Sequence, residues 1–340
     1  MMPRKVVILF LIVLEFCCGF FVSTKSTFLT KKPCRVQLEE TYRQEEYRKR
    51  NYTWPVQTYV PDTPGWRRIF ERRFAQIQQI PDLTDRYNGW LSAVTSAYVI
   101  PNFTVNGFQL TKAPVELLQE LQNSLYAGLN DTSTPTERPI EIIKSGPNSK
   151  EGFLPPLFIK QEELNAKVLR ELRDIHSQWA NVSQLIDAKT YGLRVYRNQS
   201  SLVMHTDKIN THVIASILHI DHSPDSEPWP LVLEDFHGNT HEIVMEAGDL
   251  LLYESAKVYH GRPKTFHGSW YCSIFTHYYP EGWDDKNQQL ESHFGVPPIW
   301  FETVALDDSL EALEMVGTGI REPDSRYCWS ALSNNETLSV

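Results

Sequence analysis

The chain has 340 residues, of which 41% are hydrophobic and 22% charged, and it carries a formal net charge of −9. At about 150 residues per domain, this length fits two domains or one elaborated domain. The composition excludes a disordered polymer, a collagen-like rod and a coiled coil. Because the chain is acidic and has no block of Lys and Arg interleaved with aromatic residues, nucleic acid is not expected as a partner.

Residues 1–24 have the features of a targeting segment. Arg4 and Lys5 precede the apolar run Val6 to Leu14, and small residues follow at 17–19, where a signal peptidase would cleave. Apolar residues resume at 20–22, so an uncleaved anchor of a single-pass type II membrane protein is the alternative. Both interpretations place the body in the secretory pathway, in the endoplasmic reticulum or Golgi lumen or outside the cell. A membrane is expected as a partner only if the segment is an uncleaved anchor.

Glycosylation sequons and cysteines agree with a secretory body. Cys34, Cys272 and Cys328 lie outside the targeting segment and form no CxxC pair, which excludes a disulfide scaffold and a cysteine zinc site. A bond between Cys34 and Cys328, with Cys272 as a buried thiol, and three unpaired cysteines are both open. Six Asn-x-Ser/Thr sequons occur, at Asn51, Asn102, Asn130, Asn181, Asn198 and Asn335.

The first half of the body is expected to be helical. Leu117, Leu118, Leu121 and Leu125 are spaced as one face of a helix, and Pro114 suits its first turn. We therefore expect residues 25–185 to form a helical N-terminal region that packs on a core. The expected helices are Val36–Lys49, Trp66–Gln79, Val115–Leu125 and Leu164–Ala180, with loops over Asn130–Pro139 and Ser145–Pro156.

From residue 191 the pattern changes to short runs rich in β-branched and aromatic residues. The expected strands are Gly192–Tyr196, Thr211–Ile220, Pro230–Phe236, His241–Met245, Asp249–Glu254 and Ser269–Tyr279. Closely spaced strands after a helical half predict an α+β protein whose β-sandwich or barrel is buttressed by helices. The core is expected over residues 186–283, and residues 284–340 form an acidic C-terminal extension.

The strand-rich part contains a candidate metal site. His205 and Asp207 form a His-x-Asp pair, and on a strand such residues point to the same face. His260 lies at the end of the apolar run that starts at Leu251. Two histidines and one carboxylate can fill one face of an octahedral Fe(II) ion and leave the other positions open for substrate and dioxygen. The alternative is that these histidines merely find hydrogen-bond partners.

Two basic residues follow His260. Arg262 would share the face of His260 if the strand continued, and its guanidinium could hold a carboxylate in bidentate fashion beside the metal. Lys264 has the same parity, although Pro263 interrupts a regular strand. The alternative for Arg262 is a surface position in a turn. Trp229 could rim a substrate mouth or pack over a sheet edge.

Other polar residues near this site have weaker patterns. Period-two alternation would scatter His212, His219 and His222 over two faces of a strand, so they are interpreted as strand and loop histidines and not as a second metal site. Ligand histidines normally donate their second ring nitrogen to an outer partner. Thr206 and Glu254 are candidates for that role.

The chain resembles the Fe(II)- and 2-oxoglutarate-dependent dioxygenases, in particular the prolyl 4-hydroxylase-like group. The resemblance covers residues 191–283 and rests on Tyr191 to Tyr196, His205-x-Asp207, Gly248 to Ser255, His260-Gly261-Arg262-Pro263 and Phe275-x-His277-Tyr278-x-Pro280. It implies a double-stranded β-helix, or jelly roll, with N-terminal support helices. It also implies that His205, Asp207 and His260 bind iron, that Tyr196 helps to bind 2-oxoglutarate, and that Fe(II), 2-oxoglutarate and ascorbate are used.

The sequence departs from the collagen-type prolyl hydroxylases in one respect. Those enzymes carry a Lys about ten residues after the distal histidine, where this chain has Trp270. The clamp on 2-oxoglutarate therefore falls to Arg262 or Lys264, with help from Tyr196. We expect a secretory dioxygenase that hydroxylates a C–H bond of a prolyl or other peptidyl residue, or of a glycan-linked group. The alternatives are an inactive β-helix binding module and a metal-dependent oxygenase that uses no 2-oxoglutarate.

Overall fold

A computed structural model describes residues 100–138, 142–145 and 154–283, together with Glu45 and Gly89. Several expectations lie outside these described residues. They are the targeting segment 1–24, the helices at 36–49 and 66–79, Cys34, Cys328 and the C-terminal extension 284–340.

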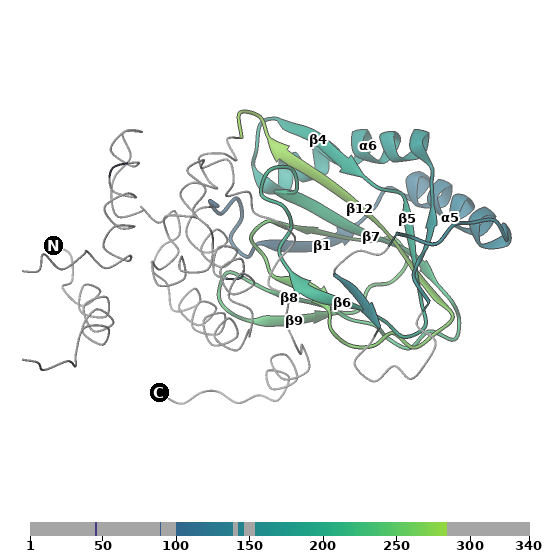
Figure 1. Ribbon diagram of the computed structural model, residues 1–340. Coiled ribbons are helices and arrows are strands. Elements are labelled where there is room, and N and C mark those ends of the chain that lie inside the picture. Colours follow the sequence, from purple (N-terminus) through teal and green to yellow (C-terminus); the bar gives the residue numbers. More distant parts are fainter. Residues whose placement is uncertain (1–44, 46–88, 90–99, 139–141, 146–153, 284–340) are drawn as a thin grey trace, which may run out of the picture.

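The described chain has two helices and twelve strands (Figure 1). The helices are α5 (Val115–Asn130) and α6 (Glu162–Ala180). The strands are β1 (Phe108–Lys112), β2 (Ile143–Ser145), β3 (Leu157–Ile159), β4 (Leu185–Thr190), β5 (Leu193–Arg197), β6 (Ser200–His205), β7 (Ile214–His222), β8 (Leu231–Glu234), β9 (Thr240–Ile243), β10 (Asp249–Tyr253), β11 (His260–Arg262) and β12 (Trp270–Pro280).

The strands form two antiparallel sheets that face each other (Figure 1). The larger sheet has the order β1-β10-β7-β12-β5-β3, with β4 also paired to β12, and the smaller sheet has the order β2-β6-β11-β8-β9. From β5 to β12 the chain passes repeatedly between the two sheets, with only β8 and β9 consecutive in one sheet. This winding of eight strands is that of a double-stranded β-helix, so the predicted fold class is confirmed.

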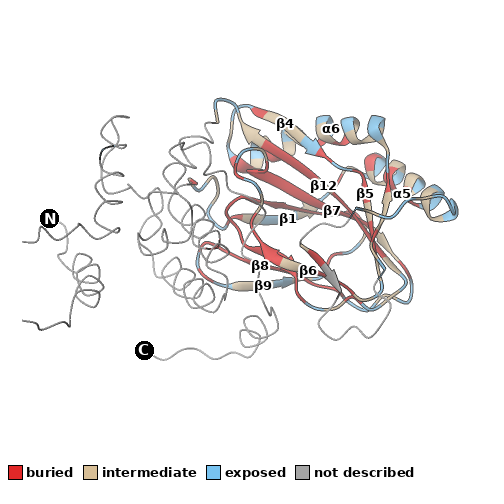
Figure 2. Ribbon diagram, in the orientation of Figure 1, coloured by how far each residue is buried: buried red, intermediate tan, exposed pale blue. Residues whose placement is uncertain are grey.

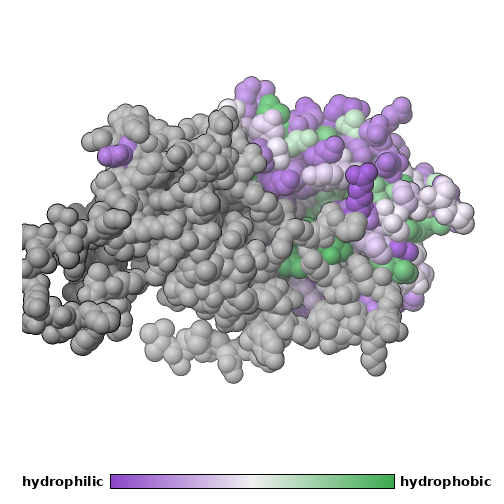
Figure 3. All heavy atoms as spheres, viewed as in Figure 1, coloured by the Kyte–Doolittle hydropathy of each residue, from purple (hydrophilic) through white to green (hydrophobic). Residues whose placement is uncertain are grey.

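Helices α5 and α6 cover the outer face of the larger sheet. Leu117, Leu121 and Leu125 of α5 and Val168 and Leu172 of α6 are fully buried in one cluster with residues of β5, β7, β10 and β12. The predicted apolar face of α5 is therefore the face that packs on the sheet. On the outside of the molecule, hydrophilic residues predominate over α6 and β4 (Figure 3). Within the described part of the chain, no helix has the length and apolar character needed to cross a membrane.

The inner faces of the two sheets enclose a second core. The central strands β7 and β12 are buried along most of their length (Figure 2). One inner cluster joins Ile217, Leu233 and Leu251 with their neighbours, and another joins Tyr196, Trp229 and Tyr271 with theirs. The second cluster gives the interior an aromatic, partly polar lining near one end of the β-helix.

Three boundaries differ from the sequence predictions, and each bears on the site. Strands β1, β2 and β3 precede residue 186, so both sheets also draw strands from the region expected to be helical. The expected strand Asp249–Glu254 is confirmed as β10, but His260, which follows the same apolar run, opens a separate strand, β11, in the other sheet. Strand β6 ends at His205, so Asp207 lies beyond the strand on which it was predicted.

Candidate metal centre

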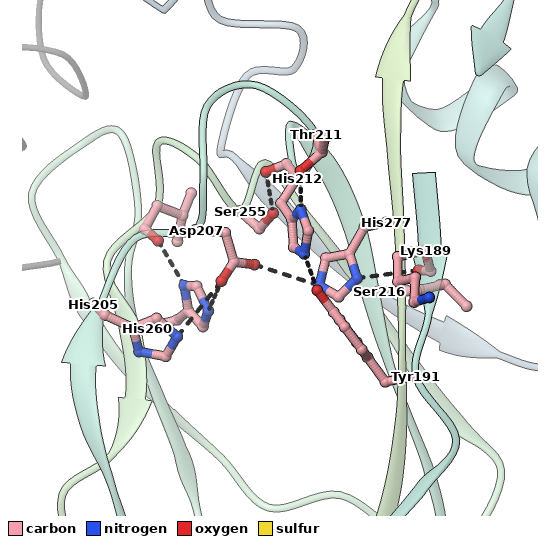
Figure 4. A network of polar contacts seen from close by, with 12 residues as sticks. Lys189, Tyr191, His205, Asp207, Thr211, His212, Ser216, Ser255, His260 and His277 are labelled. Carbon is pink, nitrogen blue, oxygen red and sulfur yellow. Dashed lines mark hydrogen bonds and ion pairs between the residues drawn. The ribbon is translucent and has the colours of Figure 1, made fainter. Parts of the chain in front are cut away.

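His205, Asp207 and His260 converge on one point inside the mouth of the β-helix (Figure 4). Each offers one ligand atom, and the three atoms all lie within 4.8 Å of one another. Asp207 Oδ1 is 3.6 Å from His205 Nε2 and 3.9 Å from His260 Nε2. The side chains of both histidines are 3% exposed and that of Asp207 is 10% exposed. Three ligand atoms of types that first-row metal ions accept are thus grouped at one buried point.

The pairing of β6 with β11 brings the two histidines together. His260 is the direct cross-strand partner of His205, and the register then shifts before Arg262 pairs with Leu202. Gly261 lies at that shift, where an added Cβ would come within 2.8 Å of the Val203 carbonyl oxygen and 2.9 Å of Met204 Cα. Only glycine allows this close approach of the two backbones, so the residue between His260 and Arg262 sets the spacing of the site.

Backbone carbonyls orient both ligand histidines. The Nδ1 atom of His205 is 2.7 Å from the Val203 oxygen, and that of His260 is 2.9 Å from the Val258 oxygen. Since a carbonyl only accepts, each Nδ1 donates and each Nε2 is left with its lone pair toward Asp207. The candidate outer partners Thr206 and Glu254 are not the groups that face these Nδ1 atoms, since backbone carbonyls take that place. The Glu254 carboxylate instead accepts hydrogen bonds from the backbone of Phe103 and Thr104.

The pKa shifts of His260 and Asp207 favour the forms that a metal would bind. Burial lowers the pKa of His260 to about 4, helped by its proximity to His205, so its imidazole is neutral at physiological pH. Burial raises the pKa of Asp207, but contacts with His205 and His277 outweigh that effect and hold it well below the usual range. The site therefore presents a neutral imidazole at His260 and a carboxylate at Asp207.

Arg262 lies inside the β-helix and not on the surface. It is 2% exposed, and its guanidinium carbon lies 4.6 Å from the ring centroids of both Trp229 and Tyr271. Nη1 donates to the Trp229 carbonyl and Nη2 to the Tyr271 hydroxyl at 3.1 Å. No carboxylate of the described residues forms an ion pair with it. Trp229 thus packs in the interior, at neither of the two places expected for it.

Of the other two predicted clamp residues, one lies inside the β-helix and the other on its surface. Tyr196 is 1% exposed, and its ring lies 5.0 Å from that of Trp229, so it shares the interior cluster with Arg262. Lys264 is exposed and pairs with Glu242 of β9 at 2.7 Å. Of the two basic candidates, only Arg262 is placed where it could hold a ligand of the interior.

Sequence reasoning did not identify a second interior arginine. Arg194 of β5 forms a two-pronged pair with Glu137, with both donor–acceptor distances at 2.6 Å, and its Nη1 lies 3.4 Å from the Tyr196 hydroxyl. The carbon of its guanidinium lies 4.9 Å from the centroid of Phe275. The signal was available, because Arg194 and Tyr196 are two residues apart on one strand and so face the same side.

The prediction that His219 and His222 would be scattered over two faces was wrong. His219 Nε2 lies 2.8 Å from His222 Nδ1, and both rings stack parallel to Tyr271. The pairing of β7 with β12 shifts register between Cys272 and Ser273, and such a bulge breaks the two-residue alternation. Cys272 is a buried free thiol, as expected for its strand.

His277 was quoted in the sequence pattern without a role, yet it lies beside the metal ligands (Figure 4). It belongs to β12, and its Nε2 is 3.6 Å from Asp207 Oδ2. The ring of His212 lies 3.9 Å from that of His277, and the Tyr191 hydroxyl is 2.9 Å from His212 Nε2. Its inward parity with Tyr271 on the same strand was the signal that could have found it.

Comparisons with known proteins gave similar structures only. No family model matches the sequence, and no curated protein matches it either. AviO1 from Streptomyces viridochromogenes Tue57 is 15% identical with a TM-score of 0.41, over 54% of this chain and 94% of that one. A prolyl-4-hydroxylase of Pseudomonas putida is 16% identical with a TM-score of 0.36, over 56% and 100% of the two chains.

A third similar structure is named with its ligands. EctD from S. alaskensis with 2-oxoglutarate and 5-hydroxyectoine is 13% identical with a TM-score of 0.39, over 54% of this chain and 75% of that one. The assignment of the double-stranded β-helix rests on the strand order of this chain itself.

Proposed function

We propose that this protein is an Fe(II)- and 2-oxoglutarate-dependent dioxygenase that hydroxylates a C–H bond of a peptidyl residue, with a prolyl residue as the first candidate. The observation that carries the proposal is the buried convergence of His205, Asp207 and His260 within a double-stranded β-helix. When bound there, Fe(II) and 2-oxoglutarate would activate O2 as the oxidant, so that one oxygen atom of O2 enters the C–H bond and the other enters succinate, which is released with carbon dioxide.

The donor set fits Fe(II). Two imidazole nitrogens and one carboxylate form the facial set of non-haem Fe(II) oxygenases, which leaves the remaining positions open. His205 and His260 each present Nε2, because their Nδ1 atoms are engaged by backbone carbonyls. A structural zinc site would instead be closed by a fourth protein ligand. Among the described residues the cluster contains three ligands.

Arg262 supports 2-oxoglutarate as the cosubstrate. A buried guanidinium with no carboxylate partner costs several kcal/mol unless an anion joins it. Its described partners are a carbonyl and a phenol, which are neutral acceptors. A carboxylate of the cosubstrate would satisfy the remaining N–H groups in bidentate fashion. The hydroxyls of Tyr196 and Tyr271 are placed in the same cluster to assist.

Tyr191 offers an exposed aromatic surface for a substrate beside the metal ligands. Tyr191 is 41% exposed and contacts His212 and His277, so its ring borders the metal ligands while remaining open to solvent. An exposed aromatic ring beside a metal site offers an apolar face for a proline ring or for the apolar face of a sugar. A peptide with an accessible prolyl residue is the substrate that the proposal tests first.

A location in the secretory pathway is part of the proposal. It rests on the targeting segment and on the sequons. Asn102, Asn130, Asn181 and Asn198 are all exposed in the described residues, as glycan acceptors must be. Expression in a secretory eukaryotic cell followed by glycosidase digestion tests it. A mobility shift that disappears when the asparagines of all six sequons become glutamine is expected, and an unshifted protein would contradict a lumenal body.

Turnover of 2-oxoglutarate tests the reaction. Purified protein with Fe(II), ascorbate and a library of proline-containing peptides should release succinate, and His205→Ala should abolish the release. The matched control is His241→Ala, because His241 also contacts a carboxylate, that of Asp235 at 2.8 Å, on the β8–β9 hairpin. The control should behave as the wild type.

The same samples separate the alternatives. Calorimetric titration of 2-oxoglutarate into Mn(II)-loaded protein without oxygen should show binding that is lost in Arg262→Leu. A protein that binds neither metal nor 2-oxoglutarate would be a binding module. A protein that binds metal and consumes oxygen without binding 2-oxoglutarate at millimolar concentration would be an oxygenase of another class.

A further inference from the structure

The hydroxyl of Tyr271 uses only its acceptor side within the described chain. The residue is 3% exposed, and its oxygen accepts a hydrogen bond from Arg262 Nη2 at 3.1 Å. Burial raises the pKa of this phenol, so the hydroxyl keeps its hydrogen at physiological pH. That hydrogen is donated to none of the described residues. Because a buried donor without an acceptor is costly, this O–H group points to a ligand of the interior.

Arg262 places further donors beside the same hydroxyl. A guanidinium has five N–H groups, and within the described chain Arg262 uses one for the Trp229 carbonyl and one for the Tyr271 hydroxyl, which leaves three. Together with the O–H group of Tyr271, these form a set of buried donors around one point. The two oxygens of an ionised carboxylate offer about four lone pairs to such a set. The donors therefore suit a carboxylate.

The ring of Tyr271 is held in place by His219 of β7. The two rings stack with their centroids 4.1 Å apart and their planes 17° from parallel. His219 is anchored in turn, because its Nδ1 donates to the Cys272 carbonyl at 2.9 Å and its Nε2 accepts from His222 Nδ1 at 2.8 Å. The Tyr271 hydroxyl is therefore fixed beside Arg262 before a ligand binds, which lowers the entropic cost of binding.

Tyr196, the tyrosine that the sequence resemblance assigns to 2-oxoglutarate, is the cross-strand partner of Tyr271. Its hydroxyl has a different neighbour, because it lies 3.4 Å from Arg194 Nη1, and Arg194 is already neutralised by Glu137. Among the described residues, no hydrogen bond joins Tyr196 to Arg262. The two tyrosines are thus alike in burial and differ in the arginine that their hydroxyls meet.

We propose that Tyr271 and Arg262 together hold the carboxylate of 2-oxoglutarate that lies away from the metal, with the Tyr271 hydroxyl as a direct donor. This inference rests on the proposed function, because it names a binding residue for the cosubstrate of the same site. It transfers the part of the binding tyrosine from Tyr196 on β5 to Tyr271 on β12. The guanidinium donates to the tyrosine oxygen and the tyrosine donates to the carboxylate, a chain in which each hydrogen bond polarises the next.

Calorimetric titration of 2-oxoglutarate into the full-length, Mn(II)-loaded protein without oxygen tests the proposal and requires no turnover. Tyr271→Phe removes the hydroxyl and keeps the ring against His219. Tyr196→Phe is the matched control, because it removes the same group from the paired position on the next strand. In Tyr271→Phe we expect 2-oxoglutarate to bind about 10- to 100-fold more weakly, as for the loss of a hydrogen bond to a charged group. Tyr196→Phe should bind 2-oxoglutarate as the wild type does, and both variants should keep the wild-type affinity for Mn(II).

A crystal structure of the wild-type complex with Mn(II) and 2-oxoglutarate tests the contact itself. We expect the Tyr271 oxygen to lie about 2.5–3.0 Å from a carboxylate oxygen of the cosubstrate. A carboxylate bound by Arg262 but beyond hydrogen-bond distance of Tyr271 would overturn the role of Tyr271 and leave the proposed function intact. Wild-type affinity in folded Tyr271→Phe, or an equal or larger loss in Tyr196→Phe, would do the same. A wild-type protein that binds Mn(II) but no 2-oxoglutarate at millimolar concentration would overturn both proposals.

Discussion

Arg262 and Tyr271 meet across the interior of the β-helix, where the guanidinium lies over the phenol ring at 4.6 Å and donates to its hydroxyl at 3.1 Å. Tyr271 is on β12, next to Trp270, which occupies the position where collagen-type prolyl hydroxylases carry a lysine. Under the proposed function, Arg262 on β11, whose guanidinium contacts the Tyr271 ring, would take the part of that lysine. A displaced clamp of this kind would keep a cosubstrate site while changing its surroundings.

Removal of the Arg262 charge should weaken 2-oxoglutarate selectively. In Arg262→Leu we expect the KM for 2-oxoglutarate to rise roughly 10- to 100-fold, because a hydrogen bond to a charged group contributes about 1.5–3 kcal/mol. Metal affinity should change little, since Arg262 contacts none of the three ligand residues. Steady-state kinetics and Mn(II) titration measure the two effects.

Lys264→Leu is the matched control for that measurement. It removes a cation two residues away that lies on the surface and pairs with Glu242. Its KM for 2-oxoglutarate should equal that of the wild type. A larger effect in Lys264→Leu than in Arg262→Leu would show that the exposed lysine closes over the site, and wild-type values in both would place the cosubstrate elsewhere.

Gly261→Ala should damage the metal centre through the backbone. The added methyl group would lie 2.8 Å from the Val203 oxygen, so β11 must move away from β6 and carry His260 with it. Overpacking of this kind costs about 1–3 kcal/mol of folding stability. Co(II) affinity should also fall, and by more than in a variant that loses similar stability away from the metal point. Gly128→Ala is the control, because its methyl group would also clash, with Ile159, but on α5. Equal Co(II) affinity in the two variants would contradict the role of Gly261.

Much of the fold and the three candidate metal ligands could be predicted from local patterns. The apolar spacing of Leu117, Leu121 and Leu125 predicted the packed face of α5, and the His-x-Asp pattern with a distal histidine predicted the cluster. These features depend on period and residue type, which sequence displays directly. The side chains of His205 and His260 come together because these residues are cross-strand partners. Asp207 lies two residues beyond the end of β6 and still reaches the same point.

What could not be predicted depends on register. The stacking of His219 and His222 on Tyr271 arises where β7 has one extra residue opposite β12, between Asp221 and His219. A bulge changes which residues share a face, and no local pattern reveals it. The ion pair of Arg194 with Glu137 joins a strand to a distant loop, so it too required the structure.

Acid should destabilise the fold through His176 of α6. This histidine is fully buried, its Nε2 has no hydrogen-bond partner among the described residues, and burial lowers its pKa from 6.5 to about 4. The unfolded chain therefore takes up the proton more readily than the folded protein. The stabilisation is complete above pH 6.5 and is lost as the pH falls toward 4, a loss on the order of 3 kcal/mol.

Urea unfolding between pH 4 and 8 measures this effect in the wild type and in His176→Leu. The variant removes the titrating group from its place beside Tyr278, whose ring centroid is 4.6 Å away. The difference in unfolding free energy between the two proteins should change in favour of the variant as the pH falls. Parallel curves would mean that His176 does not titrate differently in the folded protein and the unfolded chain.

The pair of Arg194 and Glu137 should behave as a buried ion pair that is costly to break but not needed as such. Both side chains are 12% exposed, so Glu137→Gln leaves the guanidinium beside Tyr196 without an anion. The loss should be about 3 kcal/mol, whereas the double variant Arg194→Met with Glu137→Leu should lose much less, because no charge then remains buried. Urea unfolding of the wild type, Arg194→Met, Glu137→Leu and the double variant gives the interaction free energy of the cycle. Additive losses would show that solvent screens the pair, and a wild-type stability of Glu137→Gln would show that the buried arginine finds another acceptor.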